Sequence, residues 1–175
     1  DGGSLGDLLA KRGKLTPTEA AIIAKAVCDG LAAAHQKGIF HRDIKPANIL
    51  MSPDGQTIKI SDFGIAHVPT PVSGTPDTTF AKGGAGTPWY MSPEQARGDT
   101  VDEKTDLYSL GVVLYEMTSG YSYLDFSSDL LRDVAKVKNT PPRQMPAAVP
   151  ARMRQVIFKA LAKDPNARFQ SATEM

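Results

Sequence analysis

Two short apolar runs around a turn constrain the fold of this 175-residue chain more than any other feature. Residues 49–51 (Ile-Leu-Met) and 58–60 (Ile-Lys-Ile) have the composition of β-strands, and Pro-Asp-Gly at 53–55 predicts a turn between them. The pattern therefore predicts an antiparallel hairpin. Asn48 and Asp62 lie seven residues on either side of the glycine of that turn. We expect both at the open end of the hairpin, where a carboxylate and an amide oxygen form a site that suits Mg²⁺.

The segment before the hairpin carries charged groups that suit phosphoryl transfer. Because Pro46 disfavours helix at Lys45, this segment is expected to be an extended loop in which Asp43 and Lys45 project to the same side. Asp43 can accept a hydroxyl proton and orient a nucleophile, and Lys45 can offset negative charge on a transferred phosphoryl group. A solvated loop with an incidental Asp-Lys pair is the alternative. The joint pattern of loop, hairpin and spacing favours the catalytic interpretation.

With these residues in view, the chain resembles the C-terminal lobe of eukaryotic-type (Hanks-type) Ser/Thr protein kinases, and its bacterial members in particular. His-Arg-Asp-Ile-Lys-Pro-Ala-Asn at 41–48 resembles their catalytic loop, and Asp-Phe-Gly at 62–64 resembles their metal-binding motif. Gly-Thr-Pro-Trp-Tyr-Met-Ser-Pro-Glu at 86–94 resembles the segment that closes their activation loop. The resemblance covers residues 1–175. It implies a mainly α fold with a small β-hairpin, an activation loop at about 62–94, and an N-terminal β lobe that is absent from this sequence.

The resemblance also implies roles for individual residues. The catalytic group comprises Asp43, Lys45, Asn48 and Thr87. The group expected to contact ATP comprises Leu50, Lys45, Asn48 and Asp62, and its last two members are expected to ligate Mg²⁺, or Mn²⁺ in its place. The structural group comprises His41, Phe63, Gly64, Glu94, Asp106 and Arg168. Within it, Asp106 is expected to hold the backbone of the catalytic loop, and Arg168 is expected to pair with Glu94.

The long segment between the hairpin and the closing motif predicts a regulatory loop. Residues 65–88 are rich in Pro, Thr, Ser and Gly and show no periodicity, and loops of that length are usually functional or disordered. A phosphate on Thr78 or Thr79 would add about −1.5 to −2 charge and seek a cation. Arg42, next to Asp43, is the natural receptor. A plain solvated linker is the alternative for these threonines.

Helical patterns fill most of the remaining chain. Ser4 is a predicted N-cap, and Thr-Pro-Thr-Glu at 16–19 is a capping box for a helix that should run to about Lys37 and stop at Gly38. Residues 104–119 are apolar nearly all round, which predicts a buried helix. Two further helices are expected at 127–138 and 153–161.

Composition limits the classes of partner. The net charge of +1 argues against a nucleic-acid surface. No run approaches the ~18–20 apolar residues that span a bilayer, and a single cysteine, Cys28, fits a reducing compartment. A cytoplasmic location is therefore expected. Because the sequence starts at Asp1 and stops at Met175, inside a new helical pattern, we expect a piece of a longer protein, and a membrane anchor elsewhere in that protein stays open.

These observations favour ATP-dependent phosphorylation of Ser/Thr in protein substrates by the parent protein. No Gly-x-Gly-x-x-Gly occurs in the chain, and the resemblance assigns that loop to the missing N-terminal lobe. The isolated piece is therefore expected to transfer phosphate very poorly or not at all. A pseudokinase scaffold and a small-molecule phosphotransferase are the alternatives. The first is disfavoured because a scaffold has no chemical need for the intact set Asp43, Lys45, Asn48 and Asp62. The second is disfavoured because small-molecule phosphotransferases lack the closing segment from Thr87 to Glu94, which is present here with its expected anchor Arg168.

Overall fold

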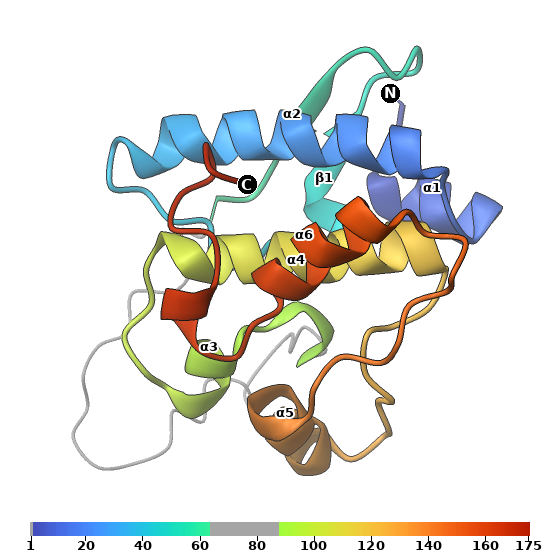
Figure 1. Ribbon diagram of the computed structural model, residues 1–175. Coiled ribbons are helices and arrows are strands. Elements are labelled where there is room, and N and C mark those ends of the chain that lie inside the picture. Colours follow the sequence, from blue (N-terminus) through green and yellow to red (C-terminus); the bar gives the residue numbers. More distant parts are fainter. Residues whose placement is uncertain (1, 64–87) are drawn as a thin grey trace.

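The computed structural model describes residues 2–63 and 88–175, which form a mainly helical fold with one small β-hairpin, as predicted (Figure 1). The longer helices, in chain order, are α1 (Leu5–Arg12), α2 (Pro17–His35), α3 (Pro93–Arg97), α4 (Glu103–Ser119), α5 (Leu130–Asn139) and α6 (Ala151–Ala160). Short 3₁₀ turns are η1 (Pro46–Asn48), η3 (Pro88–Tyr90) and η4 (Pro165–Ala167). The hairpin pairs β1 (Ile49–Met51) with β2 (Ile58–Ile60).

Helix α4 forms the centre of the molecule. It is buried on nearly every side, and α2 and α6 pack on it (Figure 1). Its all-round apolar sequence predicted this position, because such a helix cannot present a polar face to water. Despite this apolar character, neither α4 nor any other helix within residues 2–63 and 88–175 is long and apolar enough to cross a membrane.

The predicted helix starts at Ser4 and Thr16 are confirmed. The Ser4 hydroxyl accepts the N–H of Asp7, and the Thr16 hydroxyl accepts the N–H of Glu19. In turn, the carboxylate of Asp7 accepts the backbone N–H of Ser4, and that of Glu19 accepts the backbone N–H of Thr16. Helix α2 ends at His35, and a turn carries the chain to Gly38, whose φ of 71° is a conformation that glycine adopts without strain. This turn brings the chain from the end of α2 to the catalytic loop.

The prediction of a helix from residue 127 was wrong by three residues at its start, because α5 begins at Leu130. Asp129 is the N-cap and accepts the N–H of Arg132. Ser127 lies outside the helix, where its own N–H donates to both carboxylate oxygens of Asp133 at 2.9 Å. A side chain that captures a backbone N–H in this way competes with helix formation.

The hairpin forms where the sequence predicted it, with a register that differs by one residue. Ile49 pairs with Ile60, so the turn is centred between Asp54 and Gly55 rather than on Gly55. The N–H of Ser61 donates to the carbonyl of Asn48 at 2.9 Å, and Asn48 therefore faces Ser61 rather than Asp62. The open end of the hairpin still carries both Asn48 and Asp62.

Close packing between α4 and α6 makes a first prediction. A Cβ on Gly111 would lie 2.7 Å from the Cβ of Ala160 in α6. Gly111→Ala gains about 1 kcal/mol in helix propensity but costs ~1–3 kcal/mol by overpacking. We expect a net loss of about 1 kcal/mol in the free energy of unfolding, measured in urea. In the matched control Gly30→Ala, the new Cβ meets only the flexible tip of Ile60, so stability is expected to hold or rise. Equal stabilisation by both substitutions would contradict the packing argument.

Candidate active site

The loop before the hairpin places a carboxylate and an ammonium group side by side. Lys45 is extended, with φ −154° and ψ 162°, so its side chain projects to the same side as that of Asp43. The Nζ of Lys45 lies 2.6 Å from Oδ2 of Asp43, and the two side chains are 31% and 55% exposed. An exposed carboxylate can accept a hydrogen bond from a hydroxyl group, and an ammonium beside it can bind a phosphoryl group.

Asn48 is fixed by the same loop. Its side chain is buried, and its Nδ2 donates to the backbone carbonyl of Asp43 at 2.9 Å and to Oδ2 of Asp43 at 3.2 Å. Because the amide nitrogen makes both bonds, the amide oxygen is the atom that can ligate a cation. Asn48, at the end of the 3₁₀ turn η1, is thus tied directly to Asp43, the predicted proton acceptor.

Asp62 follows β2 as an exposed residue with a φ of 57°. A positive φ in a residue other than glycine costs of order 1–3 kcal/mol and is common at functional sites. Ser61 links the two predicted metal ligands, because its N–H donates to the carbonyl of Asn48 and its hydroxyl donates to Oδ2 of Asp62 at 3.1 Å.

The donor set fits Mg²⁺ by its chemistry. Asn48 and Asp62 offer hard oxygen ligands, and Mg²⁺ is commonly held by one or two carboxylates together with water and phosphate oxygens. Among the residues that the structure describes, no three His, Cys, Asp or Glu side chains gather as a metal site. A divalent cation held by Asn48 and Asp62 would need further oxygen ligands besides these two.

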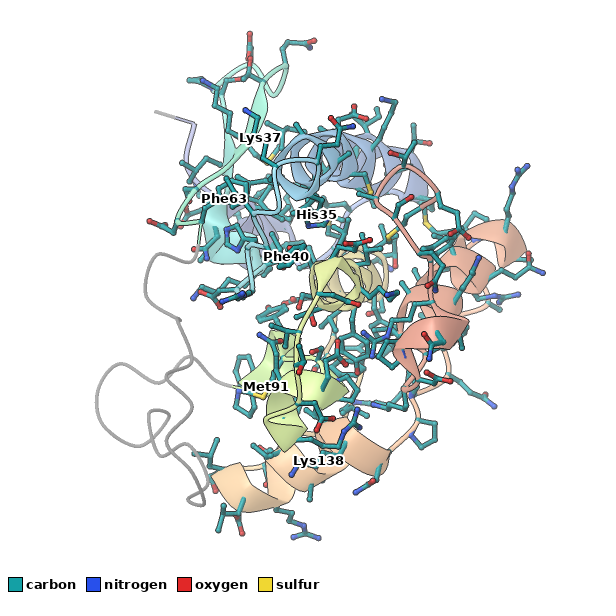
Figure 2. All side chains as sticks on the ribbon, turned by 90° about the vertical axis from the view of Figure 1, so that its left-hand side faces the viewer. His35, Lys37, Phe40, Phe63, Met91 and Lys138 are labelled. Atoms are coloured by element: carbon teal, nitrogen blue, oxygen red, sulfur yellow. The ribbon has the colours of Figure 1, made fainter. Side chains whose placement is uncertain are left out.

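His41 joins the catalytic loop to the end of the hairpin. Its buried ring donates from Nε2 to the carbonyl of Ser61 at 2.7 Å and accepts the N–H of Asp43 at Nδ1. These two bonds define the tautomer with its proton on Nε2. The ring of Phe63 packs against it at 4.8 Å between centroids. Figure 2 shows Phe63 on the hairpin side of the molecule.

The carboxylate of Asp106 holds the catalytic loop from α4. It is fully buried, and its oxygens accept the N–H of His41 at 2.8 Å and the N–H of Arg42 at 2.7 Å. Arg42 has a φ of 67°, which lies in the left-handed region that residues other than glycine seldom adopt. Two bonds to a charged acceptor, each worth about 1.5–3 kcal/mol, are enough to offset this strain.

His35 belongs to the same cluster, and the sequence analysis missed it. Its Nε2 lies 2.8 Å from Oδ2 of Asp106, and its ring meets Phe40 edge-on (Figure 2). It is the last residue of α2, so it ties the end of that helix to the loop that follows. The sequence does indicate that a buried carboxylate such as that of Asp106 needs several hydrogen-bond donors. The spacing of residues does not, however, identify which histidine provides one of these donors.

Glu94 and Arg168 form a buried, two-pronged ion pair. Nη1 and Nη2 of Arg168 each lie 2.7 Å from one oxygen of Glu94, and Thr105 donates to the same carboxylate. Arg168 also donates to three backbone carbonyls, those of Ala162, Lys104 and Lys163. Burial by itself raises the pKa of Glu94, but the bonds and charge of Arg168 outweigh it and lower the pKa. The pair fastens α3 to the end of the chain.

Of the other predicted site residues, one lies on β1 and the rest lie outside the described residues. Leu50 is 44% exposed on β1, so its side chain is open to a ligand. The remaining predicted positions, which lie outside residues 2–63 and 88–175, are Gly64, Thr78, Thr79 and Thr87. Their roles, and that of Arg42 as a phosphate receptor, stay predictions.

Comparison with known proteins gives the same family over the whole chain. Residues 1–175 match the model of the protein kinase domain. The chain is 40% identical over 177 residues to the serine/threonine-protein kinase PknB of Mycobacterium leprae, covering 100% of this chain and 28% of that protein. PknB of Mycobacterium tuberculosis (strain H37Rv) is 41% identical with the same coverage. The PknA kinase of Corynebacterium glutamicum is 40% identical over 99% of this chain and 36% of its own length.

The chain therefore belongs to the protein kinase family. Its relatives named above are bacterial serine/threonine-protein kinases. The chain spans 28% of the length of the PknB proteins and 36% of that of PknA.

The Glu94–Arg168 pair makes a second prediction. Glu94→Gln leaves the buried Arg168 charge with a neutral partner, and breaking one side of such a pair costs ~3–5 kcal/mol. We expect the free energy of unfolding in urea at neutral pH to fall by about 3 kcal/mol. In the control Glu174→Gln, the lost ion pair with Lys159 is 42–44% exposed, and the change is expected to stay below ~1 kcal/mol.

The lowered pKa of Glu94 gives this stabilisation a pH dependence. The folded pKa lies below the ordinary value of 4.5, so the unfolded chain binds the proton first as the pH falls. The contribution is complete above that ordinary value and is lost as the pH falls through the folded pKa. The stability difference between wild type and Glu94→Gln should therefore shrink in acid. A difference that stays constant down to about pH 3 would contradict the ion-pair account.

Proposed function

We propose that the protein transfers the γ-phosphoryl group of ATP to serine or threonine hydroxyls of protein substrates. One observation carries this proposal: Asp43, Lys45 and Asn48 are bonded to one another on a loop that leads into the strand pair ending at Asp62. Phosphoryl transfer depends mainly on positioning and charge neutralisation, and this cluster offers both. The names of the relatives support the choice of Ser/Thr as acceptors.

In this proposal Asp43 orients the substrate hydroxyl and accepts its proton. Its carboxylate is held by Lys45 Nζ at 2.6 Å and by Asn48 Nδ2 at 3.2 Å, so it is fixed before substrate arrives. Lys45 then offsets charge on the transferred phosphoryl group, because it lies within bonding distance of the base. Preorganised groups of this kind lower the barrier without reorganising during the reaction.

Mg²⁺ is the cofactor that we propose with ATP, held by Asn48 and Asp62, with Mn²⁺ able to take its place. The metal would neutralise charge on the nucleotide phosphates. Leu50, exposed on β1, is the proposed apolar contact under the adenine. We also propose that residues outside this chain cover the phosphates, since Gly-x-Gly-x-x-Gly is absent from the sequence. On this account the 175 residues alone transfer phosphate very poorly.

The proposed setting is the cytoplasm. Cys28 is a buried free thiol, which fits a reducing compartment, and ATP and protein substrates are the proposed partners. The charge balance of +1 offers little attraction for a nucleic acid.

Asp43→Asn in the full-length protein tests the proposed reaction. The amide keeps the shape of the side chain but cannot accept the proton, and general-base catalysis typically contributes 10²–10⁴-fold. We expect phosphate transfer from radiolabelled ATP to a serine or threonine peptide to fall by about that factor. Asp29→Asn is the control, because Asp29 lies exposed on α2, where it pairs with the exposed Lys25.

Activity that survives Asp43→Asn at the wild-type rate would contradict the assignment of the base. A wild-type protein that phosphorylates a sugar or an aminoglycoside in preference to peptides would contradict the substrate class. Either result is visible in the same assay with the acceptor changed.

A further inference from the structure

The side chain of Gln95, in the short helix α3, makes one hydrogen bond within its own helix start and another to the catalytic loop. Its Oε1 accepts the N–H of Ser92 at 3.0 Å, which closes the capping box at the start of α3. Its Nε2 reaches across to the catalytic loop and donates to the carbonyl oxygen of Arg42 at 2.8 Å. The second bond joins residues that are 53 positions apart.

The bond from Gln95 adds a second restraint on the backbone of Arg42, a residue with a positive φ. Arg42 has a φ of 67°, and its N–H is held by Oδ1 of Asp106 at 2.7 Å. Its carbonyl is held by Gln95. The backbone of this residue is thus fixed on both sides, from α4 and from α3. The peptide group that Gln95 holds leads directly into Asp43, so its orientation sets the direction of that side chain.

The platform that carries Gln95 is itself firmly fixed. The neighbouring Glu94 is paired with the buried Arg168. The carbonyl of Tyr90 accepts the hydroxyl of Ser109 from α4 at 2.7 Å. These bonds fix the position of α3, and through Gln95 a change in that position would displace the carbonyl of Arg42.

We propose that Gln95 is a positioning residue that couples α3 to the catalytic loop, by holding the Arg42 carbonyl and so orienting Asp43. The proposal rests on the proposed function only for its kinetic consequence. Its structural content, a bond that restrains the loop, stands without it. The proposed effect of Gln95 passes through the Arg42–Asp43 peptide.

The chemistry of the side chain provides a matched pair of variants. Gln95→Glu retains an oxygen for the Ser92 N–H, and glutamate is a normal partner in a capping box, but it has no N–H for Arg42. Gln95→Met has similar length and can form neither bond. Gln155→Glu, exposed on α6, repeats the charge change at a distant place and is expected to behave as wild type.

Two measurements on the full-length protein test the coupling. Hydrogen exchange, followed by mass spectrometry on the peptide that contains residues 41–45, reports the opening of the loop. Peptide phosphorylation gives kcat and KM. One net hydrogen bond corresponds to roughly a tenfold change in an equilibrium. We therefore expect about tenfold faster exchange and about tenfold lower kcat in both Gln95 variants, with KM for ATP changed less than about twofold.

The results separate the coupling from a purely structural role. If Gln95→Glu matches wild type and only Gln95→Met is impaired, the capping box alone matters and the proposal is overturned. Unchanged exchange in both variants also overturns it. Should wild type show no kinase activity, the proposed function fails, whereas faster exchange in both Gln95 variants would still support the restraint on the loop.

Discussion

The structure depends above all on one buried carboxylate. Asp106 lies on the central helix α4 with no exposure to solvent, and the donors to its two oxygens are the backbone N–H groups of His41 and Arg42 and the ring of His35. A buried charge is costly unless it is hydrogen-bonded, so the carboxylate and the loop require each other. This mutual requirement holds Arg42 in a left-handed conformation that the chain would otherwise avoid.

From that anchor the site is built in two directions. Toward the hairpin, the ring of His41 bonds the carbonyl of Ser61, and Asn48 bonds Asp43, so the predicted base and metal ligands share one framework. Toward the end of the chain, Gln95 bonds the carbonyl of Arg42, and the ion pair of Glu94 with Arg168 fixes α3. These bonds hold the loop in one arrangement, which suits chemistry that depends on positioning.

The sequence was sufficient for features that are decided locally. The caps at Ser4 and Thr16, the extended Lys45 and the hairpin follow from near neighbours in the chain. Features decided by tertiary contact were less accessible. The bonds of Asp106 and the partner of Arg168 were expected only through a family resemblance. The predicted register differed from the observed one by one residue, because the prediction centred the turn on Gly55 and the structure centres it between Asp54 and Gly55. The bond of His35 to Asp106 and that of Gln95 to Arg42 have no local sequence signal, since they join residues 71 and 53 positions apart.

Anomalous X-ray scattering from Mn²⁺ bound in place of Mg²⁺, in crystals of the full-length protein with a non-hydrolysable ATP analogue, tests the central claim most directly. If the anchored loop and the hairpin form a phosphoryl-transfer site, an anomalous peak will lie within coordination distance of the Asn48 amide oxygen and the Asp62 carboxylate. For Mg²⁺, the ion that Mn²⁺ replaces, the distance to an oxygen ligand is about 2.0–2.1 Å. The nucleotide phosphates will complete its ligands. A well-ordered nucleotide whose metal contacts neither residue would contradict the account.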